Sequence, residues 1–223
     1  HPGLHLIYSQ FRTLEGIGLM GAVLEANGWV EFKIAFSQGE WSIVTDLKDV
    51  STKNCYPLYT GTEDVEQKEI IRNIFNGDWD KVPKSITNSL NPIQKNNNDG
   101  GIIKTIMITA SGAEGITLKN VRFVHLMEPY WHPVRTEQVI GRAVRICSHQ
   151  ALPTDERNVT VYLYIMKFSQ KQIKGDPKAD NKKDRDPKLN SEIRRFDRSK
   201  IDKITPVTTD QTLWEISRLK QKI

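Results

Sequence analysis

Short apolar runs with polar ends recur along the chain and predict strands. Residues 4–11 (LHLIYSQF), 102–109 (IIKTIMIT), 121–128 (VRFVHLME) and 159–166 (VTVYLYIM) are each mostly apolar over the length of a strand. Continuous apolar runs, rather than strict alternation, are typical of parallel strands that are buried on both faces. The pattern therefore predicts a parallel sheet, with residues 29–36 and 55–61 as further short strands.

Stretches with helical periodicity lie between these runs. Residues 13–28 carry apolar side chains at helical spacing and end on Asn27-Gly28, and residues 62–76 form an amphipathic stretch with acidic residues in its first turn. A further helix is expected from Pro133, which is well tolerated at a first helical position. Strands that alternate with helices predict an α/β fold in which a parallel sheet carries helices on both faces.

The remaining stretches are polar, and three of them shape the expected domain organisation. Residues 37–54 and 76–101 are poor in regular patterns and rich in polar or turn-forming residues, so we expect loops, the second of them a polar insertion. We expect one domain over residues 1–166, a basic flexible segment over 167–203 and a C-terminal helical extension over 204–223. The fold should thus be a sheet domain with a basic loop and a C-terminal helix.

The positive charge of the chain is concentrated in one segment. The chain of 223 residues has a net charge of +5, and residues 167–203 hold 13 Lys and Arg against 7 Asp and Glu. Few apolar residues and mixed signs are typical of a solvated linker. The alternative is an element that contacts phosphate groups, in which case the segment binds nucleic acid by itself.

Cysteine and histidine usage argues against a metal centre or a disulfide framework. The two cysteines, Cys55 and Cys147, are far apart and the histidines show no metal-ligand spacing, so we expect no metal site and a reducing, intracellular location. His125 lies inside an apolar strand and is expected to be a core histidine rather than a base. No apolar run is long enough for a membrane span, and the start at His1 without Met suggests a piece of a longer polypeptide.

Small polar residues follow the predicted strands at their carboxyl ends. They are Ser9, Gln10, Thr60, Gly61, Thr109, Ser111 and Gly112. In a parallel sheet these ends meet at one edge, where hydroxyl groups and unhindered backbone N–H groups can bond phosphate oxygens. We therefore expect contacts to a phosphate backbone here, with ordinary capping of strand ends as the alternative.

The stretch "QVIGRAVR" places Gln138, Arg142 and Arg145 at spacings of four and three residues, which puts all three on one face if they lie on a helix. A complete nucleotide site is not expected, because "SGAEG" has two glycines without the lysine of a phosphate-binding loop and the chain has no acidic pair for magnesium. The sequence thus predicts a polar cluster that could serve a nucleotide held elsewhere.

These stretches together resemble a known pattern. "TASGAEGITL" followed by "QVIGRAVR" resembles motifs V and VI in the second RecA-like domain of superfamily 2 helicases and translocases, and "LIYSQF" resembles motif IV. The order and spacing fit over residues 4–166. The stretch from "MEPYWHPVRTEQ" to "VTVYLYI" is similar to helicase-like ATPases of large nucleocytoplasmic DNA viruses, related to the poxvirus transcription-associated nucleoside triphosphatases.

The resemblance implies roles for particular residues. Arg142 and Arg145 match arginines that act on the γ-phosphate of ATP, and Gln138 matches a glutamine that orders this cluster. Gly115 and Thr117 are implied to approach the nucleotide, although many members of the family have Asp or Asn at the latter position. Glu114 is implied to lie near the same site, where it pairs with an arginine of motif VI or is exposed. Thr109, Ser111 and Gly112 are implied to lie along the nucleic-acid backbone.

The resemblance also implies an activity and its partners. The chain is expected to be the second half of an ATP-dependent nucleic-acid helicase or translocase and to be inactive alone, with the ligands of Mg²⁺ on a preceding N-terminal RecA-like domain. The expected partners are DNA or RNA, that domain and transcription machinery, in host cytoplasm or a virion. The alternative is a non-catalytic RecA-like module that binds a protein such as a viral transcription complex.

Overall fold

The computed structural model describes residues 2–13, 15–112, 115–169, 173–174 and 207–221. They form two compact units, one of residues 1–127 and 137–163 and one of residues 128–136 and 164–223. The first unit is built on a sheet. It ends at Leu163, three residues before the end of the domain expected from the sequence, residue 166. That the stretch 128–136 belongs with the C-terminal part was not indicated by the sequence.

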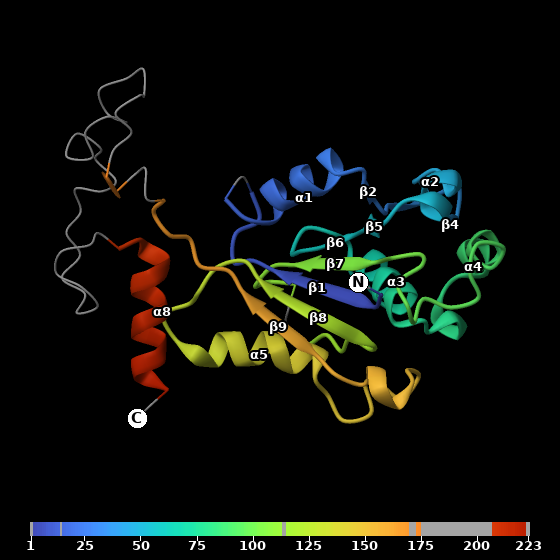
Figure 1. Cartoon of the computed structure of the whole chain (residues 1–223). Coiled ribbons are helices and arrows are strands. Elements are labelled where there is room, and N and C mark those ends of the chain that lie inside the picture. Colours follow the sequence, from blue (N-terminus) through green and yellow to red (C-terminus); the bar gives the residue numbers. More distant parts are fainter. Residues whose placement is uncertain (1, 14, 113–114, 170–172, 175–206, 222–223) are drawn as a thin grey trace, which may run out of the picture. The chain divides into compact units, whose positions relative to one another are not determined.

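One parallel sheet organises the first unit. Within the described residues it has five strands in the order β6-β7-β1-β8-β9 (Figure 1). The strands are β1 (Leu4–Tyr8), β6 (Leu58–Tyr59), β7 (Thr105–Ile108), β8 (Val121–Leu126) and β9 (Thr160–Leu163). Every pair in this sheet is parallel, so the prediction of a parallel α/β sheet is confirmed. The first strand of the chain lies in the middle, because crossovers place β7 on one side of it and β8 on the other.

Helices cover both faces of the sheet, as the alternating pattern predicts (Figure 1). Helix α1 (Ile17–Ala26) packs Ile17 on the face that carries Ile7 of β1. Helices α3 (Val65–Asn76) and α5 (Pro133–Ala143) belong to the larger core on the opposite face, which contains Leu6. Asp64 caps the start of α3, because its side chain accepts a hydrogen bond from the Glu66 N–H, and Pro133 is the first residue of α5 as predicted.

The prediction of one strand over 29–36 and a loop over 37–54 is wrong. The first stretch divides into β2 (Val30–Glu31), which pairs with β5 (Cys55–Tyr56), and β3 (Ile34–Ser37), which forms a hairpin with β4 (Glu40–Ile43). Helix α2 (Leu47–Thr52) follows, and the Asp46 side chain caps it by accepting from the Lys48 N–H. The hairpin turn Gln38-Gly39, with both residues at positive φ, and the cap at Asp46 are short local signals within a polar stretch.

The expected loop over 76–101 is also wrong as a description of the whole stretch. It contains the short helix η1 (Trp79–Lys81) and helix α4 (Lys84–Leu90), whose Ile86 and Leu90 are fully buried in the larger core. These two side chains lie four residues apart and therefore on one helical face. The abundant Asn, Pro and Gly around them masked this short apolar stripe.

A buried asparagine holds the end of this stretch in place. The Asn97 side chain is fully buried and its amide nitrogen donates to the carbonyls of Phe75 and Ile103 at 3.0 and 3.1 Å. Its Oδ1 accepts from the N–H groups of Ile102 and Ile103 at 3.0 and 2.9 Å. One side chain thus satisfies four buried backbone groups and joins the end of α3 to the residues that lead into β7.

Replacing Asn97 tests this arrangement. Asn97→Ala leaves buried backbone donors and acceptors without partners, so we expect the free energy of unfolding to fall by about 3 kcal/mol. Asn96→Ala is the matched control, because the neighbouring side chain is exposed and accepts only from the Asn98 N–H. Urea denaturation of both variants measures the difference, and equal losses would contradict the assigned role of Asn97.

A stack of aromatic rings crosses β1, β8 and β9 in the first unit. His5 Nδ1 and His125 Nε2 lie 3.0 Å apart, so one ring N–H donates to the other ring, and His5 also stacks on Phe123 and His125 on Tyr162. Burial, then the nearby charges of His125 and Lys104, lowers the pKa of His5 to about 3. Burial also lowers the pKa of His125. Both rings are therefore neutral in the folded protein at neutral pH, consistent with a core role for His125.

This pair makes stability depend on pH. As pH falls below about 6.5, the unfolded chain takes up protons that the folded pair excludes. The contribution of the pair to the free energy of unfolding is therefore fully present above that pH and is lost as the pH falls towards 3. The urea midpoint should fall between pH 7.5 and 5.5, and the fall should be shallower in His5→Phe. His132→Gln, outside the pair, should keep the original slope, and a slope unchanged by His5→Phe would refute this origin.

The second unit contains the predicted C-terminal helix, α8 (Thr209–Lys220). Thr208 and Gln211 form a reciprocal capping box at its start, and the Thr208 hydroxyl also donates to the Met166 carbonyl at 2.6 Å. The Lys220 ammonium lies 3.8 Å from the centre of the Trp131 ring. Most of the expected basic segment 167–203 lies outside the described residues. Within the part described, no helix has the length and hydropathy of a membrane span.

Candidate functional site

The polar residues at the end of α5 are partly arranged as the sequence predicts. Gln138 and Arg142 lie one turn apart on the helix, but α5 ends at Ala143 and Arg145 is outside it, so the prediction of one continuous helical face is wrong for Arg145. The chain turns here because the Ser148 N–H donates to the Arg145 carbonyl and its hydroxyl donates to the Ala143 carbonyl. Ser148 is buried, so this turn is part of the core.

Arg145 is nevertheless brought back to the last turn of the helix. Its Nε donates to the Gly141 carbonyl at 3.4 Å, and its Nη1 donates to the Thr117 hydroxyl at 2.6 Å. Within the described residues, Arg145 has no carboxylate partner, and Gln138 and Arg142 make no side-chain hydrogen bond or ion pair. Two guanidinium groups with no neutralising acid in the part of the chain that the structure describes are suited to bind an anionic group.

The loop that carries Thr117 is fixed by backbone contacts on two sides. The Leu118 N–H donates to the Arg142 carbonyl at 3.2 Å, which joins the loop to the end of α5. The Asn76 amide donates to the Thr117 carbonyl at 3.0 Å, and its Oδ1 accepts from the Lys119 N–H at 2.8 Å. The predicted motif V and motif VI residues are therefore brought together from positions 28 residues apart in the chain.

Asn76 is a residue of this site that the sequence did not reveal. It is the last residue of α3 and is buried, but in the sequence it appears only as a polar residue at the end of an amphipathic helix. Gly115 is exposed at a φ of +72°, in the left-handed region that favours glycine, with open space around it. Glu114 lies outside the described residues, and its predicted role stays a prediction.

The predicted residues at the strand ends form one edge of the sheet. The loops after β6 and β7 touch directly: a Cβ on Gly61 would lie 2.8 Å from the Ser111 hydroxyl, and a Cβ on Gly112 would lie 2.1 Å from the Tyr59 carbonyl oxygen. The Thr109 and Ser111 hydroxyls are 3.1 Å apart. Glycine is therefore required at position 112 by this close approach of two backbones.

Two of these residues use their polar groups inside the protein. Ser9 is fully buried and its hydroxyl accepts from the Phe11 N–H at 3.1 Å. Thr60 is also fully buried, and its hydroxyl and N–H donate to the Glu63 carboxylate at 2.8 and 2.5 Å. The contacts match the capping alternative for both side chains, whereas Gly61 and Ser111 are exposed and Gln10 is half-buried.

The carboxylate that caps Thr60 is ionised over a widened pH range. Burial alone would raise the pKa of Glu63, but hydrogen bonds from Thr60 and Thr62 outweigh burial and hold this pKa below its usual value. The charged form is therefore the one that fixes the loop after β6. Its role is structural, since the carboxylate oxygens are already engaged.

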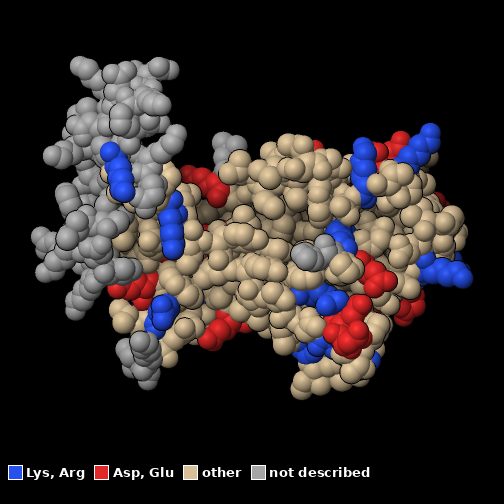
Figure 2. All heavy atoms as spheres, viewed as in Figure 1, with Lys and Arg blue, Asp and Glu red and all other residues tan. Residues whose placement is uncertain are grey.

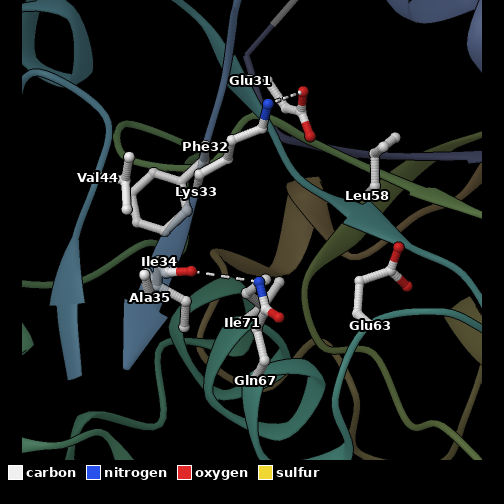
Figure 3. Close-up of a pocket in the computed structure, with 10 residues that line it drawn as sticks. All are labelled: Glu31, Phe32, Lys33, Ile34, Ala35, Val44, Leu58, Glu63, Gln67 and Ile71. Atoms are coloured by element: carbon white, nitrogen blue, oxygen red, sulfur yellow. Dashed lines mark hydrogen bonds and ion pairs between the residues drawn. The ribbon is translucent and has the colours of Figure 1, made fainter. Parts of the chain in front are cut away.

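A cavity of about 300 Å³ lies elsewhere in the first unit (Figure 3). It is lined by residues of β2, β3, α3 and adjoining loops, among them Phe32, Ile34 and Ile71. Its charged and amide groups have partners: Lys33 pairs with Glu31 at 2.8 Å, Gln67 donates to the Ile34 carbonyl, and Glu63 holds Thr60. These pairings do not offer free charge to a nucleotide, so the cavity is separate from the arginine cluster.

The described surface carries mixed charge. On the face shown in Figure 2, the Lys and Arg side chains of the described residues are interspersed with Asp and Glu and form no continuous basic field. In the described ranges, no group of three or more His, Cys, Asp or Glu side chains could hold a metal ion.

Comparison with known proteins identifies related sequences. Residues 84–147 match the helicase conserved C-terminal domain. The chain is 36% identical over 163 residues to a protein of Acanthamoeba polyphaga mimivirus named "Putative ATP-dependent RNA helicase", covering 73% of this chain and 16% of that protein. It is 32% identical over 188 residues to the "Termination factor NPH-I homolog" of African swine fever virus, covering 80% of this chain and 26% of that protein.

Among solved structures, the chain is similar to the C-terminal part of the Fun30 ATPase domain, with a TM-score of 0.44 and 14% identity over 73% of this chain and 35% of that one. The chain spans about a sixth to a quarter of the length of the two viral relatives.

The two glycines near the predicted motifs should respond oppositely to alanine. A Cβ at Gly112 would meet the Tyr59 carbonyl, so Gly112→Ala should lower the free energy of unfolding by more than about 1 kcal/mol. Gly141 lies in helix α5 with open space around it, so Gly141→Ala should raise stability by about 0.5–1 kcal/mol. Urea denaturation compares them, and a loss in Gly141→Ala would show that position 141 is closely packed.

Proposed function

The chain belongs to the family of the helicase conserved C-terminal domain, and from this premise we propose that it is the arginine-bearing half of an ATP-dependent nucleic-acid helicase or translocase. In the complete protein, an N-terminal RecA-like domain holds ATP and the ligands of Mg²⁺. This chain then supplies Gln138, Arg142 and Arg145. It hydrolyses nothing by itself, because the phosphate-binding loop lies outside it.

The observation that carries this proposal is the pair of arginines at and just beyond the end of α5, which have no acidic partner among the described residues. A guanidinium remains charged at any physiological pH and offers several N–H donors in one plane, which match the oxygens of a phosphoryl group. The bond from Arg145 to Gly141 keeps its guanidinium at the turn of α5 that carries Arg142. The two guanidinium groups, one on the last turn of α5 and one just beyond it, can therefore approach a single anionic group.

The chemical contribution of these residues is electrostatic. During phosphoryl transfer, negative charge redistributes over the oxygens of the transferred group, and fixed guanidinium donors stabilise that charge without rearranging. Gln138, one turn before Arg142 on α5, supplies an uncharged donor and acceptor beside them. Magnesium supplies charge neutralisation of the nucleotide when it is bound by the other domain.

The edge of the sheet would supply the contacts to nucleic acid. Gly61 and Ser111 are exposed on touching loops, and Gln10 follows the neighbouring strand β1. Exposed backbone N–H groups, a hydroxyl and an amide can bind phosphate oxygens irrespective of base sequence. Ser9, Thr60 and Thr109 then shape the loops. Closure of the two domains on ATP would move this edge along the strand, and transcription machinery is a further partner in the proposal.

Substituting the arginines in the complete protein tests the proposal. Arg142→Ala and Arg145→Ala should each lower the kcat of nucleic-acid-stimulated ATP hydrolysis by about 10³-fold, because each removes charge from the transition state. Steady-state ATPase assays measure this effect. Arg72→Ala is the control, since Arg72 pairs with Glu69 on the surface of α3.

The outcomes separate the proposed enzyme from a non-catalytic binding module. Unchanged turnover in both variants would contradict the role of the arginines. Absence of turnover in the unmodified complete protein, with protein binding retained, would favour the binding module instead. Deletion of the basic segment, residues 167–203, adds a further test: a flatter salt dependence of nucleic-acid binding would assign phosphate contacts to that segment.

A further inference from the structure

One asparagine side chain clamps the loop that holds Arg145. The Asn76 amide donates to the Thr117 carbonyl at 3.0 Å while its Oδ1 accepts from the Lys119 N–H at 2.8 Å. An asparagine side chain has the same donor and acceptor as a peptide group, so this pairing imitates a strand partner over three residues of loop. Asn76 is only 6% exposed, which shields both bonds from competition by water.

The clamped loop in turn orients one guanidinium. The Thr117 hydroxyl accepts from Arg145 Nη1 at 2.6 Å, and this is a hydrogen bond to a charged donor, a strong class. Arg145 is exposed and lies beyond the last helical residue, Ala143, so helix geometry alone does not fix its direction. Without Thr117, the described contacts of its guanidinium reduce to the long Nε bond to Gly141 at 3.4 Å.

Further contacts make the loop and the turn around Arg145 one rigid body. Lys119 is tied a second time, through an ion pair of its ammonium with Asp78 at 2.6 Å. The Asn120 N–H donates to the Ser148 carbonyl at 2.9 Å, and the Arg145 N–H donates to the Ser148 hydroxyl at 3.3 Å. The backbone of Arg145 and the Thr117 hydroxyl, which accepts from its guanidinium, are therefore held by one connected set of contacts that begins at Asn76.

We propose that Asn76 and Thr117 are positioning residues that aim Arg145 at the nucleotide, and that Thr117 acts on Arg145 rather than on the nucleotide itself. This inference rests on the proposed function and deepens it. The Thr117 hydroxyl accepts from one N–H of Arg145, at Nη1, so the contact leaves the remaining guanidinium donors for phosphate oxygens. Preorganisation of this kind favours the transition state, because the ordering of a long side chain is completed before the reaction.

Substitutions at Thr117 separate positioning from direct contact in the complete protein. Thr117→Val keeps the shape and removes the hydroxyl, so we expect kcat for ATP hydrolysis to fall about 10-fold with an unchanged KM for ATP. Thr117→Ser restores the hydroxyl and should restore kcat. Thr45→Val is the matched control, because the Thr45 hydroxyl bonds Lys33 N–H and the Glu31 carbonyl in another part of the unit.

A double substitution shows through which residue Thr117 acts. If it acts through Arg145, then Thr117→Val should add no further loss to Arg145→Ala. A raised KM for ATP in Thr117→Val that persists beside Arg145→Ala would overturn the inference and assign Thr117 to the nucleotide. If kcat falls as expected in Arg145→Ala but is unchanged in Thr117→Val, the inference alone is overturned. If kcat is unchanged in Arg145→Ala, both the proposed function and this inference are overturned.

The clamp itself has a readout that does not depend on activity. Asn76→Ala removes the acceptor of the Lys119 N–H, so hydrogen exchange at this amide should quicken by about 10-fold or more, and kcat should fall as in Thr117→Val. Asn27→Ala is the matched control: Asn27 ends α1 and its amide donates to the Val23 carbonyl, far from Lys119 in the sequence. Unchanged exchange, or fast exchange with an unchanged kcat, would overturn the role of Asn76.

Discussion

The parallel pairing of β1 with β7 on one side and β8 on the other is the constraint on which the rest of the first unit depends. Because β1 is central, its side chains are buried on both faces, with Leu6 in one core and Ile7 in the other. Parallel pairing also aligns the carboxyl ends of the strands. The loops after β6 and β7 meet there, and the residues predicted to contact nucleic acid gather at that edge without being close in sequence.

Asparagine side chains then fix the irregular connections between these strands. Asn97 satisfies four backbone groups near the end of α3, and Asn76 satisfies two on the loop before β8. Both substitute for backbone partners where the chain leaves regular structure, and both are buried. The result is that Arg145, although outside α5, is held by contacts that begin on a different helix. A guanidinium on a turn can therefore be held in a defined orientation without being part of a helix.

The parts of the fold that the sequence predicted are those whose patterns are long or strongly apolar. The runs that became β1, β7 and β8 stand out because strands buried on both faces are apolar almost throughout. The run that became β9 is equally apolar, although β9 is an edge strand whose residues are mostly exposed. Short elements escaped for the opposite reason. Helix α4 buries Ile86 and Leu90 within one and a half turns of a polar stretch, and the hairpin of β3 and β4 depends on a two-residue turn. Such signals are too brief to outweigh the surrounding composition.

The sequence by itself determined the long apolar strands, the longer helices, the presence of Gln138, Arg142 and Arg145 close together in the chain, and the small residues at the strand ends. Each of these follows from a local pattern or from the resemblance of neighbouring motifs. Only the tertiary structure decided which of these side chains are available. It buries the hydroxyls of Ser9 and Thr60 in internal bonds, leaves Arg142 without an acidic partner in the described residues, and joins Arg145 to Thr117 and, through the loop, to Asn76. The physical reason is that hydrogen bonds between residues distant in the chain depend on how the sheet brings loops together, and no periodicity along the sequence records that meeting.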